Sequence, residues 1–192
     1  MRRQERSGSA LGALGSQGVS RISISLEGDR DMVYGAIDEK SEQWYTRLCK
    51  VFEAIKNKQK DYNWLITALD GVPQKIEECC KGKDHCWLTG EELSQIVAED
   101  DGQWVWAVLS GFDKSIALSE VLKYPRPYAD GYGGFWENPL SMQHPLAAIE
   151  IVPWDSSLVL FFSKQEDLVR DFLDFFPLSE ELSAYNAKLA NR

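Results

Sequence analysis

Two cysteines and a histidine–cysteine pair lie close together in the middle of the chain, and these residue types bind zinc. Cys79, Cys80, His85 and Cys86 would supply the four ligands of a structural zinc site. Zinc ligands are usually separated by about two to four residues, whereas the members of each pair here are adjacent, so their side chains do not converge easily. We therefore predict no metal site and no cofactor, and we interpret the stretch as a polar loop with reduced thiols.

His144 is the second candidate for chemistry, because an imidazole titrates near neutral pH and can act as a general base. The carboxylates that would orient it and the serines that it would activate are Asp130, Glu150, Asp155, Ser141 and Ser156. No Gly-x-Ser-x-Gly elbow surrounds either serine. We assign no catalytic residue, and the favoured role of His144 is a hydrogen bond that holds a neighbouring loop.

That loop, residues 123–145, combines five aromatic residues with four prolines and three glycines. Neither a helical nor a strand period runs through it, and it is too long and too apolar for a simple connection. Its glycines lack the Gly-Lys-Ser/Thr that completes a phosphate-binding loop, so they are interpreted as turn residues. The loop is predicted to be a binding surface, with the candidate residues Tyr128, Asp130, Tyr132, Phe135, Trp136, Glu137 and His144.

The elements that would position this loop follow from hydrophobic periodicity. Residues 1–20 have no period and are predicted to be a disordered leader, and residues 21–27 alternate as in a half-buried strand. An apolar stripe predicts a helix over residues 41–57, and residues 62–69 form a second strand. Thr89 and Glu92 make a capping box before a short helix. Residues 104–109 are apolar on both faces and predict a central strand.

The second half of the chain predicts a short helix over residues 115–122 and a hairpin of residues 146–152 and 158–162. Ser163 and Glu166 predict another capping box before a helix, and a last helix starts near Ser179. The expected fold is a single α+β domain over residues 21–192, with a roughly five-stranded mixed or antiparallel sheet packed by helices.

Composition limits the classes of function. The net charge of −9 disfavours binding to nucleic acid, and it would attract a basic partner. Acidic residues recur along one predicted helix at positions 167, 171 and 174. No run of residues approaches the length that spans a bilayer, and the expected location is the cytoplasm.

In composition the chain resembles the immunity proteins with which bacteria neutralise their own toxins: it is acidic and compact, it has an aromatic loop, and it lacks catalytic motifs. Those proteins have diverse folds, so the resemblance assigns no residue a role. It implies a cytoplasmic protein-binding module that covers the active cleft of a basic toxin. One alternative is a small enzyme or ligand-binding domain, with a pocket under the aromatic loop that uses His144 and a carboxylate. Another is a subunit whose aromatic patch closes a homodimer.

Overall fold

The structure of the protein is a computed structural model that describes residues 32–41, 46–80 and 82–191. The expected leader at residues 1–20 and the expected strand at residues 21–27 lie outside the described residues.

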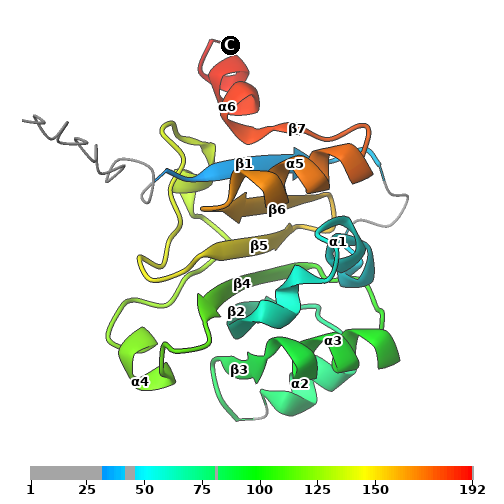
Figure 1. Cartoon of the computed structure of the whole chain (residues 1–192), viewed down its shortest axis with the longest axis vertical. Helices are drawn as coiled ribbons and strands as arrows, with labels where there is room; N and C mark the ends of the chain where they lie inside the picture. The colour runs from blue at the N-terminus through cyan, green and yellow to red at the C-terminus, as the bar shows by residue number, and fades with distance from the viewer. Residues whose placement is uncertain (1–31, 42–45, 81, 192) are drawn as a thin grey trace, which may run out of the picture.

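One seven-stranded sheet forms the centre of the fold, with the strand order β3-β2-β4-β5-β6-β1-β7 (Figure 1). Every pair of neighbouring strands is antiparallel. The class is therefore α+β, as expected, but the expected number of five strands is wrong. The strands are β1 Tyr34–Asp38, β2 Tyr62–Asp70, β3 Cys86–Thr89, β4 Trp106–Asp113, β5 Ile149–Trp154, β6 Leu158–Ser163 and β7 Glu180–Glu181.

The helices are short. In the part of the chain that the structure describes, none is long and apolar enough to cross a membrane. The α-helices are α1 Leu48–Ala54, α2 Gln74–Cys79, α3 Gly90–Glu99, α4 Leu118–Val121, α5 Glu166–Phe175 and α6 Leu182–Ala190, and the 3-10 helices are η1 Lys58–Asp61 and η2 Gly133–Trp136.

The two faces of the sheet are covered differently. Neighbouring side chains of a strand point to opposite faces, so Leu109 packs in the core under α1, α2, α3 and α5, whereas Val108 packs in a second core. That second core includes Ala129 and Phe135 of the aromatic loop and Leu182 of α6. We call the first side the helix face and the second the loop face; in Figure 1 the loop follows α4 as a yellow-green trace.

The sequence pattern placed several elements correctly. β4 is an interior strand between β2 and β5, although it begins at Trp106 rather than at Trp104. β5 and β6 pair as the expected hairpin. The Thr89–Glu92 capping box is present at the start of α3, because each side chain bonds the other residue's backbone N–H.

Two helix starts differ from the expectation. The helix expected over residues 41–57 begins only at Leu48, since Thr46 has a left-handed φ of 58° and Arg47 is extended. The expected capping box at Ser163 is wrong: the Ser163 hydroxyl accepts the N–H of Gln165, and α5 begins after Gln165 without a side-chain cap.

Candidate functional site

The aromatic loop lies across the loop face and is hydrogen-bonded to two regular elements, β2 and α6. Thr67 of β2 donates its hydroxyl to the carbonyl of Pro127 at 2.8 Å. Asn186 of α6 donates its amide to the carbonyls of Phe135 and Glu137 at 3.0 and 3.2 Å. Because both donors sit on regular elements, these bonds fix the path of the loop, which itself contains the 3-10 helix η2.

The structure separates the predicted binding residues into three groups. Phe135 and His144 are buried, and Tyr132 and Trp136 are half-buried. Tyr128, with 52% of its surface exposed, is accessible together with Asp130 and Glu137. A partner can therefore contact the third group directly, whereas the side chains of Phe135 and His144 are buried and not accessible to it.

The half-buried and buried aromatic residues form one ring cluster. The ring of Tyr132 lies 5.3 Å from that of Tyr128 and 4.7 Å from that of Phe135, both edge-on. Trp136 meets Trp154 of β5 at 5.4 Å. The cluster thus connects the exposed Tyr128 to the sheet through continuous aromatic packing.

Glu150 of β5 lies at the centre of the loop face, and its carboxylate is fully buried. Its Oε1 accepts the hydroxyl of Ser110 on β4 at 3.1 Å and the backbone N–H of His144 at 3.3 Å. Its Oε2 accepts the backbone N–H of Gln143 at 3.2 Å. One carboxylate therefore joins two strands to the end of the aromatic loop.

Burial raises the pKa of Glu150 from 4.5 to about 7, because removal from water disfavours the charged form. The hydrogen bonds from Gln143, His144 and Ser110 act in the opposite direction, since they stabilise the carboxylate. Desolvation outweighs them, which makes Glu150 a group that changes charge near neutral pH.

His144 is held by its own backbone environment. Its Nε2–H donates to the carbonyl of Val121 at 3.0 Å, and its Nδ1 accepts the N–H of Leu146 at 3.2 Å. Burial lowers the pKa of His144, so the neutral ring is favoured. Both ring nitrogens are hydrogen-bonded to backbone groups, and His144 bonds Glu150 through its backbone N–H. This geometry is that of a residue that holds the loop rather than of an acid–base pair.

Gln143 connects the buried carboxylate to the exposed Tyr128. Its side-chain amide donates to the carbonyl of Tyr128 at 2.8 Å and accepts the N–H of Tyr128 at 3.0 Å. The two bonds fix the backbone of Tyr128 from both sides. Gln143 and Ser110 belong to no sequence motif, and the only feature that marks them in the sequence is a polar residue within or beside an apolar run.

One groove of the described surface lies beside β1, next to residues 138–140 of the aromatic loop. It has a volume of about 610 Å³, and residues of β1, α5 and the segment 138–140 line it, among them Tyr34, Leu140, Val169 and Arg170. His144 is not part of this groove.

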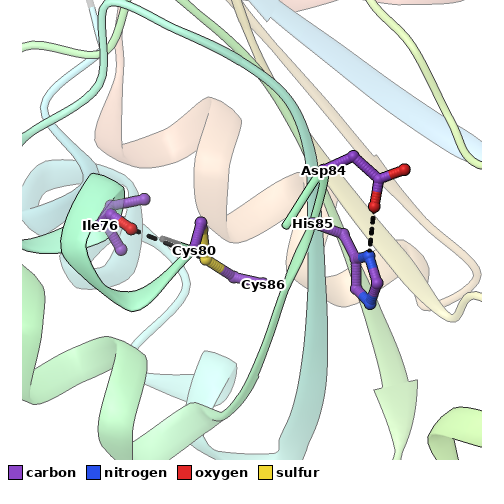
Figure 2. The surroundings of a disulfide bond; sticks show 5 residues. All are labelled: Ile76, Cys80, Asp84, His85 and Cys86. Atoms are coloured by element: carbon purple, nitrogen blue, oxygen red, sulfur yellow. Dashed lines mark hydrogen bonds and ion pairs between the residues drawn. A yellow bond between two sulfur atoms is a disulfide. The ribbon is translucent and has the colours of Figure 1, made fainter. Parts of the chain in front are cut away.

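The cysteine-rich stretch holds a disulfide instead of free thiols. Cys80, at the end of α2, is bonded to Cys86, the first residue of β3, and both are buried. In Figure 2 the ring of His85 points away from this disulfide, and its Nδ1 lies 2.8 Å from the carboxylate of Asp84. The expectation of reduced thiols is wrong for this pair. Within the described residues, no three His, Cys, Asp or Glu side chains are grouped as a metal site would need.

Comparison of the chain with protein-family models, with curated proteins and with solved structures found no match. Its function must therefore be argued from its own residues.

Proposed function

We propose that the protein binds a basic protein partner through exposed side chains of the aromatic loop. Tyr124 and Tyr128 of the loop, and Leu122 just before it, are each at least 39% exposed. We call them the tyrosine surface. Tyrosine is enriched among the residues that carry most of the energy of protein interfaces, because it offers a large apolar body with a polar tip.

The observation that carries the proposal is the rigid presentation of Tyr128. An exposed aromatic residue normally loses conformational freedom when a partner buries it, and this loss weakens binding. Here Gln143 holds the backbone of Tyr128 through two hydrogen bonds, and Tyr132 packs against its ring. Much of the ordering is therefore complete before a partner arrives.

Charge supports a basic partner. The two cations of this part of the loop are paired within the protein: Lys123 with Glu120 at 2.6 Å, and Arg126 with Asp84. The net charge of the chain is −9. The acidic residues of α5 lie on the helix face, so they would act on a partner through the long-range field rather than by contact. In its most specific form, the proposal is that of a toxin-neutralising immunity protein.

The test has two steps. Partners are first captured from the native host, and the association and dissociation rates of a captured basic protein are then measured with the wild-type chain and with its variants. Tyr128→Ala should speed dissociation by roughly thirtyfold, as expected when an anchor worth about 2 kcal/mol is lost. Asp130→Lys should mainly slow association. Leu178→Ala is the matched control, because Leu178 is an equally exposed apolar residue, at 58%, outside the loop. Unchanged kinetics of Tyr128→Ala and Tyr124→Ala variants would refute this interface.

The alternative function is binding of a small ligand in the groove beside β1. Its volume of about 610 Å³ lies within the range of about 300–1,000 Å³ that is typical of ligand pockets. Under this alternative a small molecule should co-purify with the protein and be displaced by a Leu140→Trp substitution, which fills the groove. Absence of a co-purified molecule together with capture of a basic protein would favour the first proposal.

A further inference from the structure

A chain of hydrogen bonds runs from the interior of the sheet to the tyrosine surface. It starts at Ser110 and Glu150, continues through the backbone of Gln143, and ends with the side chain of Gln143 on both backbone groups of Tyr128. The carboxyl group in this chain is that of Glu150, and it is fully buried.

We propose that Glu150 is a proton-operated switch, whose protonation weakens the hold of Gln143 on Tyr128 and so loosens the tyrosine surface. The importance of this switch for binding rests on the function proposed above, but the switch itself is a property of the protein alone.

The hydrogen bonds set the chemical consequence of protonation. A proton on Oε1 can be donated to Ser110, whose hydroxyl then turns from donor to acceptor by rotating about its C–O bond. The same oxygen then has less capacity to accept the N–H of His144. Oε2 remains an acceptor for Gln143, but as a neutral carbonyl, and bonds to a charged acceptor are roughly twice as strong as neutral ones.

The groups around Glu150 leave its charge largely uncompensated. On the sheet, Ser110 of β4 and the paired residue Phe162 of β6 flank it. Among titratable groups, Tyr132 and His144 of the loop and Lys164 after β6 are near enough to matter. His144 favours its neutral form, and the Lys164 ammonium donates to the carbonyl of Pro145 rather than to Glu150. The proton equilibrium therefore lies near neutral pH instead of far below it.

The test is a pH titration of the ¹⁵N-labelled full chain by NMR between pH 5.5 and 8.5, with no partner present. The backbone amides of Gln143 and His144 should shift with a common midpoint near pH 7, and the Tyr128 amide should follow with the same midpoint. The protection of the Tyr128 amide against hydrogen exchange should fall roughly fivefold on the acid side, as for the loss of about one hydrogen bond. The carbon shifts of the His144 ring report its own titration separately.

Two variants distinguish the switch from a general pH effect. Glu150→Gln should abolish the common midpoint at all three amides. Gln143→Ala should keep it at His144 and remove it at Tyr128, and this variant keeps the test decisive if Glu150→Gln does not fold. Three outcomes would overturn the proposal. The chemical shift of the Tyr128 amide could be independent of pH while those of Gln143 and His144 change. The pH dependence of the Tyr128 shift could persist in either variant, or no amide shift could change near pH 7.

The same variants separate this inference from the proposed function. If a captured partner dissociates several times faster at pH 6 than at pH 8 from the wild type, and equally fast at both from Glu150→Gln, the switch acts on binding. If the amides titrate as expected but Tyr128→Ala binds normally, the proposed interface fails while the switch stands.

Discussion

The buried charge of Glu150 should make the protein less stable as the pH rises through neutrality. The pKa of this carboxyl is about 7 in the folded protein and 4.5 when it is exposed to water. Because the folded pKa is raised, the folded state binds the proton more tightly than the unfolded state. The associated stability is fully present below pH 4.5 and is lost as the pH rises through 7.

The size of the effect follows from the two pKa values. One pKa unit corresponds to 1.36 kcal/mol, so the free energy of unfolding should fall by roughly 2–3 kcal/mol between pH 5 and pH 8 because of this group. For a domain with ordinary marginal stability this is a large fraction of the total.

The assay is urea denaturation of the wild type and of Glu150→Gln at pH 5, 6, 7 and 8. The readout is the difference between the two proteins at each pH, because the contributions of all other titrating groups, His144 included, cancel in it. The absolute stability of the variant is not informative, since the new amide N–H₂ would face the N–H donors of Gln143 or His144. Parallel stability curves for the two proteins across this range would refute the reasoning.

Three further outcomes are expected. His144→Ala should lower the free energy of unfolding by about 2 kcal/mol in urea denaturation, since two hydrogen bonds at about 1 kcal/mol each are lost; loss of a measurable turnover with an intact fold would instead favour an enzyme. Thr89→Ala should cost about 1 kcal/mol, because the N–H of Glu92 loses its acceptor, and a neutral result would show that the cap contributes little. Reduction of the Cys80–Cys86 bond should cost about 2 kcal/mol, as expected for a short loop, whereas a double Cys→Ala variant should not respond to the reductant.

Hydrophobic periodicity predicted those elements whose pattern is local. β4 and β5 have apolar residues on both faces because each strand is covered on both faces. The capping box of Thr89 depends on only four consecutive residues. Three strands escaped prediction because their patterns are weak. β1 is the short segment YGAID, β3 is the four residues CWLT beside a polar loop, and β7 has only two residues. β1 and β7 form because β6 pairs with β1 and β1 with β7, and β3 forms because it pairs with β2; these long-range conditions are not contained in any local window.

The candidate site was likewise predictable only where it depends on local sequence. The composition of the aromatic loop, rich in proline and glycine, predicted a binding surface, and its Tyr128 is exposed. The burial of Phe135 depends on the sheet face beneath it, which the loop sequence does not reveal. The role of Glu150 depends on its meeting with Ser110 and Gln143, which come from separate segments of the chain.

The strand order also has a consequence for biosynthesis. β1 is the first strand of the described chain to be translated, yet its neighbours in the sheet are β6 and β7, which are the last two. Ala36, for example, pairs with Phe161 on one side and with Glu181 on the other. The nascent chain therefore exposes β1 without these neighbours until β6 and β7 have left the ribosome, and such late, long-range pairing slows folding. Unpaired strands are templates for aggregation, so ribosomal stalling or truncation before β6 should yield aggregation-prone chains rather than a smaller folded protein.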